Sequence, residues 1–123
     1  MRAPGPAQAE ILLIEDDSDV REALAFRLGV EGFVVRLSDD APVTAGDRPP
    51  ACVVADYRLP AGDGLAAIAE ARARFGAMPA ILVTSFPEPS LRRAAARQNV
   101  EIVEKPLIDG FLVERLKALC APQ

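Results

Sequence analysis

The sequence predicts an α/β fold with a doubly wound, five-stranded parallel sheet. Three short apolar runs, at residues 11–14, 52–55 and 80–83, lack the polar alternation of a strand with one wet face, so they read as strands covered on both sides. Segments with helical spacing of apolar residues separate the strands, and the connections are short. Alternating strands and helices with right-handed crossovers give a parallel sheet between two helical layers.

The composition fits a single compact domain. The chain has 123 residues, of which 50% are hydrophobic, and we expect one domain over residues 10–120 behind a flexible tail over residues 1–9. A net charge of -4, from 14 basic and 18 acidic residues, gives no electrostatic reason to expect direct nucleic-acid binding. No apolar run approaches membrane-spanning length and the first residues are too polar for a signal peptide, so we expect a soluble cytoplasmic protein with no membrane partner.

The first part of the chain reads as a β-α-β unit. A strand over residues 10–14 leads into a helix over residues 18–29, which Asp17 or Ser18 can cap, and a second strand covers residues 33–37. The expected buried face of that helix carries four apolar residues, Val20, Ala23, Leu24 and Leu28.

The rest of the chain continues the alternation. Prolines in residues 38–50 limit any helix there to about residues 42–47. The elements that follow are a strand over 51–55, a turn-rich loop over 56–64, a helix over 65–75, a strand over 80–83, a helix over 90–98, a strand over 100–103 and a helix over 109–119. The natural strand order is 2-1-3-4-5, which makes the first and third strands neighbours.

Residue types restrict the chemistry that the chain can perform. There is no histidine, which excludes Ser-His and Cys-His nucleophile arrangements. The two cysteines, Cys52 and Cys120, are too few and too far apart in sequence for a zinc site. We expect no structural disulfide, because Cys52 lies inside a predicted buried strand and Cys120 in the last turn of the chain. Acids, a lysine and hydroxyls are left to carry any chemistry.

Acidic residues follow the first and third strands. Glu15, Asp16 and Asp17 come directly after the first strand, and Asp56 comes directly after the third. Because neighbouring parallel strands end at the same edge, where the winding of the sheet reverses, these carboxylates are expected to share a pocket. Two carboxylates about 4 Å apart repel by roughly 4 kcal/mol at an effective dielectric of about 20, so a hard cation such as Mg²⁺ is the simplest way to hold them together.

Thr84 and Lys105, each just past its own strand, add a hydroxyl and a cation to the same edge. This set suits phosphoryl transfer, since a carboxylate can act as the nucleophile when a metal and a cation neutralise the phosphoryl oxygens. Asp16 and Asp56 would hold Mg²⁺ directly, and Glu15 through water. Each residue alone also has a plainer reading, as a helix-capping acid, a loop starter, a strand-end hydroxyl or a solvated charge. Because all of these residues lie together at matching strand ends, a role in phosphoryl transfer is favoured over the plainer readings.

The motifs around these residues are specific when taken together. They are Ile14-Glu15-Asp16-Asp17, Asp56-Tyr57-Arg58-Leu59-Pro60 with Asp63-Gly64-Leu65, Val83-Thr84-Ser85 and Glu104-Lys105-Pro106. With these motifs the chain resembles the receiver domains of two-component response regulators, from residue 10 to about residue 119. The resemblance implies the (βα)5 flavodoxin-like receiver fold, with Asp56 as the phosphoacceptor. The implied Mg²⁺ ligands are Glu15, Asp16, Asp56 and the backbone carbonyl of Arg58, with Thr84 and Lys105 contacting the phosphoryl group.

Three positions depart from what the resemblance implies or add to it. Ile102 stands where receivers usually carry a tyrosine or phenylalanine that moves with the phosphate-seeking hydroxyl residue, so the usual aromatic readout is absent. Arg58 and Phe86 lie two residues beyond Asp56 and Thr84, at positions that in the family influence hydrolysis of the phosphoaspartate. Since both side chains are large, they predict slow self-dephosphorylation through exclusion of water.

The function implied is that of a stand-alone receiver. It would accept a phosphoryl group from a sensor histidine kinase or phosphotransfer protein, then act on a downstream protein target or as a phosphate sink, with at most weak enzymatic activity of its own. Phe111 and its exposed neighbours are candidates for a homodimer or docking face. A non-phosphorylated receiver-like module is the alternative. A Mg²⁺-dependent phosphatase or nuclease is less favoured, because such enzymes usually need a second acid where this chain has Arg58.

Overall fold

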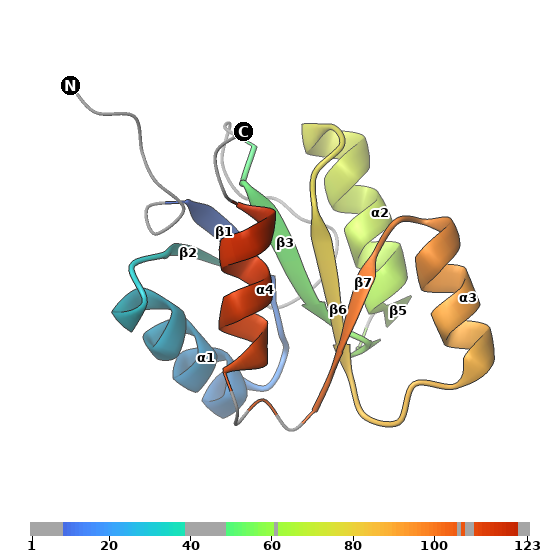
Figure 1. Cartoon of the computed structure of the whole chain (residues 1–123), viewed down its shortest axis with the longest axis horizontal. Helices are drawn as coiled ribbons and strands as arrows, with labels where there is room; N and C mark the ends of the chain where they lie inside the picture. The colour runs from blue at the N-terminus through green and yellow to red at the C-terminus, as the bar shows by residue number, and fades with distance from the viewer. Residues whose placement is uncertain (1–8, 39–48, 61, 106, 108–109, 121–123) are drawn as a thin grey trace.

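A five-stranded parallel sheet forms the centre of the computed structural model, which describes residues 9–38, 49–60, 62–105, 107 and 110–120 (Figure 1). Its strands are β1 (Glu10–Ile14), β2 (Val34–Ser38), β3 (Cys52–Asp56), β6 (Ala80–Thr84) and β7 (Glu101–Glu104). They lie in the order β2-β1-β3-β6-β7 and pair in parallel throughout. Counted within this sheet the order is 2-1-3-4-5, so the predicted α/β fold class and strand order are confirmed.

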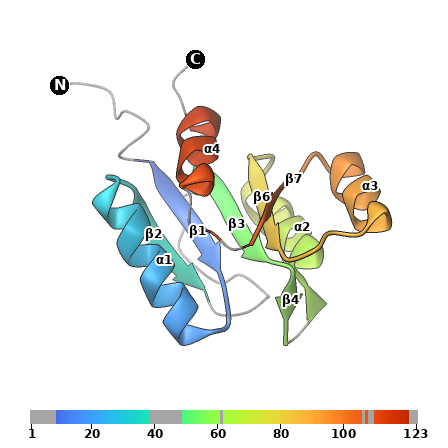
Figure 2. The same ribbon diagram turned by 60° about the horizontal axis from the view of Figure 1, so that its bottom comes forward.

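Helices cover both faces of the sheet (Figures 1 and 2). Helices α1 (Ser18–Val30) and α4 (Phe111–Leu119) cover one face, while α2 (Gly64–Phe75) and α3 (Pro89–Arg97) cover the other. Alternate residues of each strand face opposite layers, so Ile11 of β1 packs toward α1 and α4 and its neighbour Leu12 toward α2 and α3. In the part of the chain that the structure describes, no helix is long and apolar enough to cross a membrane.

The buried face of α1 differs from the predicted one. Leu28 is fully buried and Leu24 is half-buried as expected, but Val20 and Ala23 are exposed. The face against the sheet is formed instead by Leu24, Ala25 and Leu28. Because α1 carries apolar residues on more than one side, its sequence pattern fits more than one orientation of the helix, and the choice among them was made wrongly from the sequence.

The loop predicted after β3 contains a short antiparallel hairpin. Its strands are β4 (Arg58–Leu59) and β5 (Gly62–Asp63), which extend past the end of β3 (Figure 2). Asp63 then caps α2, since its Oδ1 accepts a hydrogen bond of 2.9 Å from the Ala66 N–H. The helix proposed for residues 42–47 and the tail over residues 1–8 fall outside the described residues.

The two cysteines are free thiols, as expected. Cys52 is buried at the start of β3 and Cys120 is half-buried after α4, and both belong to the apolar layer on the α1 and α4 side. Burial raises the pKa of both thiols. They therefore act as small apolar residues of the core at neutral pH.

Candidate functional site

The carboxyl ends of β1 and β3 bring three acids together. Because Ile14 pairs with Ala55, the residues that follow them, Glu15 and Asp56, leave the sheet side by side. Carboxylate oxygens of Glu15, Asp16 and Asp56 all lie within 4.8 Å of one another. Glu15 and Asp56 are buried whereas Asp16 is exposed, so the cluster opens to solvent on one side.

Lys105 meets this acidic cluster at Asp56. Its Nζ lies 2.5 Å from Oδ1 of Asp56, and the two side chains are 34% and 9% exposed. The other oxygen, Oδ2, accepts a hydrogen bond of 3.1 Å from the Arg58 N–H. Oδ1 is buried, and apart from the ion pair it receives no hydrogen bond of regular geometry from the described residues. Asp56 thus has one oxygen held by backbone and one held by charge.

Thr84 lies beside Asp56 as the last residue of β6. Asp56 pairs with Val83 across β3 and β6, and the Lys105 N–H donates to the Thr84 carbonyl at 2.9 Å, so Thr84 sits between the acid and the lysine. The Thr84 side chain is buried, and its hydroxyl donates to the Ser85 carbonyl at 3.3 Å. The hydroxyl has a weak backbone partner that it can exchange for a bound anion.

The pKa of Glu15 is higher than that of an ordinary glutamate. Burial raises its pKa, while the hydrogen bond of 3.1 Å that its Oε2 accepts from the Asp17 N–H lowers the pKa. The negative charges of Asp56 and Asp16 raise it further, and Lys105 lowers it, with a net upward shift. Without a cation, the ionised form of Glu15 is therefore costly in the folded protein.

Replacing Glu15 by glutamine is expected to stabilise the cation-free protein at neutral pH, because the raised pKa of Glu15 makes its ionised form unfavourable in the fold. Since the pKa of Glu15 is raised in the fold, wild-type stability falls as pH rises from the ordinary value of 4.5 through the raised pKa. Glutamine lacks this loss and can still accept the Asp17 N–H. Urea unfolding in EDTA across this pH range measures the difference, and equal stability of the two proteins at pH 7 would contradict it.

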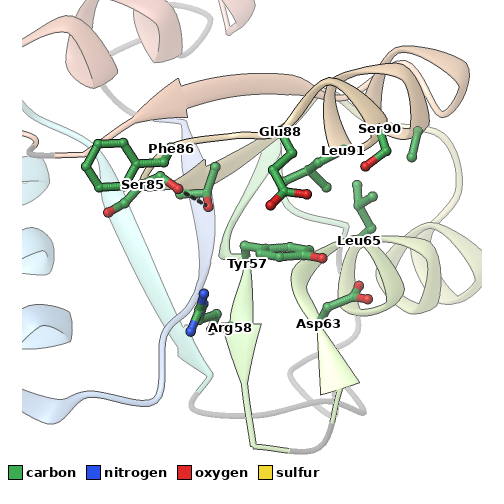
Figure 3. A pocket seen from close by; sticks show the side chains of 11 residues that line it. Tyr57, Arg58, Asp63, Leu65, Ser85, Phe86, Glu88, Ser90 and Leu91 are labelled. Carbon is green, nitrogen blue, oxygen red and sulfur yellow. Dashed lines mark hydrogen bonds between the residues drawn. The ribbon is translucent and has the colours of Figure 1, made fainter.

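Two cavities flank the acids. One of about 320 Å³ contains Asp56, Thr84 and Lys105 in its lining. A second of about 510 Å³ lies between the starts of α2 and α3, and the Tyr57 ring extends across it toward Leu65 (Figure 3). The two share six lining residues, among them Tyr57 and Thr84, so the end of β6 lines both cavities.

The side chains expected to exclude water do not cover Asp56 in this conformation. Phe86 is 91% exposed and its ring points away from Tyr57 (Figure 3). Its φ of 48° is in the left-handed region, which is unusual for a bulky residue and turns the side chain outward. Arg58 is also exposed. Both residues line the cavity that contains Asp56, so slow hydrolysis through exclusion of water stays a prediction. Ile102 is half-buried against the α2 and α3 layer.

This arrangement of residues matches a known family. The family model for the response regulator receiver domain matches residues 11–117. The chain belongs to this family. Receiver domains are phosphoacceptor switches of two-component signalling and bind Mg²⁺ at an acidic site, and this receiver has its acidic cluster at Glu15, Asp16 and Asp56. The predicted family is confirmed.

Relatives of this receiver domain differ in length. The chain is 33% identical over 119 residues to the C4-dicarboxylate transport transcriptional regulatory protein DctD of Pseudomonas aeruginosa, covering 94% of this chain but 26% of that regulator. An uncharacterised 14.6 kDa protein of Leptolyngbya boryana is 30% identical, with 93% of this chain and 92% of that protein covered. The non-phosphorylated HemR receiver domain from Leptospira biflexa has a TM-score of 0.80 at 26% identity, with 94% of this chain and 99% of that domain covered.

The structure also shows two contacts at this site that the sequence pattern did not predict. Arg21 of α1 donates from its guanidinium to the Glu15 carbonyl at 2.9 Å. Gly64 approaches the backbone of Asp56 so closely that a Cβ there would lie 2.4 Å from the Asp56 carbonyl oxygen. In the sequence, Arg21 looks like an ordinary surface residue of a helix. Gly64 stands in the motif Asp63-Gly64-Leu65, but nothing in that motif shows its close approach to Asp56.

Proposed function

We propose that this receiver domain accepts a phosphoryl group on Asp56 in a Mg²⁺-dependent reaction and works as a protein-interaction switch or phosphate sink. The observation that carries the proposal is the geometry of Asp56, a buried carboxylate paired with Lys105 at 2.5 Å and within 4.8 Å of the carboxylates of Glu15 and Asp16. Nucleophile, cation and metal-binding acids are the components that phosphoryl transfer to a carboxylate requires.

The acidic cluster fits a hard divalent cation. Three carboxylates converge there, and the buried Oδ1 of Asp56 receives no regular hydrogen bond from the described residues, so its partner is the Lys105 ammonium at 2.5 Å, which a bound cation would have to displace in part. Asp16 and Asp56 would hold Mg²⁺ directly, Glu15 through water, and the carbonyl of Arg58 would complete the protein ligands. Bound Mg²⁺ would supply positive charge against the phosphoryl oxygens.

Asp56, Lys105 and Thr84 would have separate roles in the phosphoryl transfer. A carboxylate oxygen of Asp56 attacks phosphorus and forms the new O–P bond, while the bond from phosphorus to the donor nitrogen breaks and its electron pair stays on the donor imidazole. Lys105 and Thr84 contact the phosphoryl oxygens. To do so, Lys105 must give up part of its ion pair with Asp56, and the Thr84 hydroxyl must leave the Ser85 carbonyl that it now contacts at 3.3 Å.

Incubation with Mg²⁺ and acetyl phosphate, followed by intact-mass measurement, tests the proposal. We expect one phosphate adduct on the wild-type chain and none on Asp56→Asn, which keeps the size of the side chain but not its nucleophilicity. Beryllofluoride binding provides a second readout. Since the chain has no tryptophan and a single tyrosine, Tyr57 next to Asp56, intrinsic fluorescence reports on the site.

The two alternatives predict different results in the same experiment. A non-phosphorylated interaction module would give no adduct at any donor concentration and would not bind beryllofluoride. A phosphatase would release inorganic phosphate from acetyl phosphate or a phosphomonoester with many turnovers. The exposed basic residue at Arg58, where such an enzyme usually needs a second acid, disfavours turnover.

An apolar surface next to Lys105 suits the phosphodonor protein. A groove of about 430 Å³ is lined by Val20, Ser85, Phe86, Lys105 and Leu107. Val20 and Phe86 are 39% and 91% exposed. The groove shares Ser85, Phe86 and Lys105 with the cavity that contains Asp56. A sensor histidine kinase or phosphotransfer protein would approach Asp56 over this groove, so burial of Phe86 and Val20 would supply binding free energy where transfer occurs.

Replacing Val20 by aspartate is expected to slow phosphoryl transfer from a phosphotransfer protein at least tenfold while leaving phosphorylation by acetyl phosphate nearly unchanged. The charge lowers the affinity for the protein donor without touching Asp56. Transfer is measured with the fastest donor from a panel of phosphorylated phosphotransfer proteins. Val30→Asp, at the far end of α1 and 66% exposed, is the control. Equal slowing with both donors would argue against docking at this groove.

The chain is proposed to function as a stand-alone receiver in the cytoplasm. The chain covers 92% of the relative from Leptolyngbya boryana but 26% of the DctD regulator, so similar proteins of both kinds occur. Output would then pass through a downstream protein target rather than through nucleic acid. The Phe111 side chain on α4 is 48% exposed and remains our candidate for a homodimer contact.

A further inference from the structure

Arg21 contacts the loop that carries the acids of β1. It lies in the first turns of α1, and its guanidinium donates a hydrogen bond of 2.9 Å to the carbonyl of Glu15. Its backbone N–H donates to the carbonyl of Asp17 at 2.8 Å. The second bond is the regular backbone bond of the first helical turn, so only the guanidinium bond to the Glu15 carbonyl depends on the Arg21 side chain.

The same loop is tied to the start of α1 through its own side chains. Glu15 Oε2 accepts from the Asp17 N–H at 3.1 Å, and Asp17 Oδ1 accepts from the N–H groups of Asp19 and Val20 at 3.0 and 3.1 Å. The carboxylate of Asp16 accepts none of these hydrogen bonds within the described loop. The hydrogen bonds of Glu15 and Asp17 fix the backbone on both sides of Asp16, and they leave the Asp16 carboxylate able to bind a cation.

We propose that Arg21 is a positioning residue of the cation site, which holds residues 15–17 in the conformation that brings Glu15 and Asp16 to Asp56. The inference rests on the proposed function, in which Mg²⁺ binds these acids. The guanidinium bonds to a carbonyl and not to a carboxylate, so it orders the loop without occupying an oxygen that a cation needs. Partners of this kind, which orient a ligand from behind, commonly change metal affinity about tenfold or more when removed.

The positive charge of Arg21 would weaken Mg²⁺ binding, whereas its positioning of the loop would strengthen it. A guanidinium near the site repels a divalent cation, so its removal would strengthen Mg²⁺ binding if charge were the larger effect. Positioning predicts weaker binding. The sign of the change therefore separates the two roles, and a residue that only stabilises α1 would leave the affinity unchanged.

The test measures the Mg²⁺ dissociation constant of the full chain by calorimetry and, independently, by the rise in Tm that Mg²⁺ produces over EDTA. We expect Arg21→Ala to weaken binding about tenfold and Arg21→Lys, which keeps the charge and one donor, to recover part of the loss. Arg27→Ala is the matched control, since it removes the same charge from the same helix about 9 Å further along, and it should leave the constant within about twofold.

The outcomes distinguish the inference from the function on which it rests. If the wild-type chain binds no Mg²⁺, the proposed cation site is wrong. If it binds Mg²⁺ and Arg21→Ala binds equally or more tightly, the positioning role of Arg21 is wrong while the cation site stands. Should Arg21→Ala not fold, Arg21→Gln, which keeps a donor without the charge, is compared with Arg21→Lys, and unchanged binding in both overturns the inference.

Discussion

Replacing Gly64 by alanine is expected to slow phosphorylation of Asp56 about 100-fold and to lower the stability of the fold. A Cβ at position 64 would lie 2.4 Å from the carbonyl oxygen of Asp56 and 2.5 Å from Cδ1 of Leu82. The Leu82 side chain is fully buried in the core, and the Asp56 oxygen belongs to the backbone of the proposed phosphoacceptor. Neither neighbour can move away cheaply, so the substitution must displace the end of β3 or the start of α2.

The size of the effect follows from the tightness of the contact. Overpacking a core by one methyl group typically costs about 1–3 kcal/mol, and a shift of about 1 Å at a reacting group can slow a reaction about 100-fold. Urea unfolding gives the first quantity, and intact mass after incubation with Mg²⁺ and acetyl phosphate gives the second. The hydrogen bond of 2.8 Å from the Gly64 N–H to the Tyr57 carbonyl would be strained by the same displacement.

Gly29→Ala is the matched control for this substitution. Gly29 lies in α1, a Cβ added to it would meet nothing within 4 Å, and alanine has the higher helix propensity. We therefore expect it to be neutral or to stabilise the protein by about 0.5–1 kcal/mol, with phosphorylation unchanged. If Gly64→Ala behaved like Gly29→Ala, the close approach of α2 to Asp56 would not be what fixes the position of the acid.

The sheet could be predicted from the sequence because its signal is local. Each central strand is a short apolar run that ends in a polar residue, and parallel strands put their ends at one edge, so the grouping of Glu15, Asp16 and Asp56 followed from topology. The ion pair between Lys105 and Asp56 is consistent with the same reasoning. The sequence pattern indicated which residues come together. It did not indicate which hydrogen bonds and ion pairs each of them makes.

Contacts that depend on the rotation of a helix or on the approach of two backbones could not be obtained in the same way. The buried face of α1 was assigned wrongly, because Val20 and Ala23 are as apolar as residues that do face the sheet. Phe86 is exposed and has a φ of 48°, a backbone conformation that is uncommon for a bulky residue and that the sequence pattern did not predict. Arg21 is one of several arginines on helices, and its contact with the Glu15 carbonyl exists only once the loop has folded back on α1.

Replacing Lys105 by alanine is expected to weaken the fold, strengthen Mg²⁺ binding and slow phosphorylation at the same time. The lysine lies 2.5 Å from a carboxylate that is only 9% exposed, so its removal leaves the charge of Asp56 without a partner beside two other acids. Breaking a fully buried pair costs about 3–5 kcal/mol, and because the Lys105 side chain is 34% exposed we expect about 1–3 kcal/mol in EDTA.

The changes in stability, Mg²⁺ affinity and phosphorylation rate should all follow from loss of the Lys105 ammonium. Loss of the ammonium removes a competitor for Asp56 Oδ1, so Mg²⁺ should bind more tightly and restore much of the lost stability. Phosphorylation by acetyl phosphate should nevertheless slow about 100-fold, because a donor of positive charge to the phosphoryl oxygens is gone. Lys105→Arg keeps the charge and is the control for stability. A Lys105→Ala variant that reacts as fast as the wild type would mean that this lysine only neutralises the resting acid, and that the bound cation alone supports the transfer.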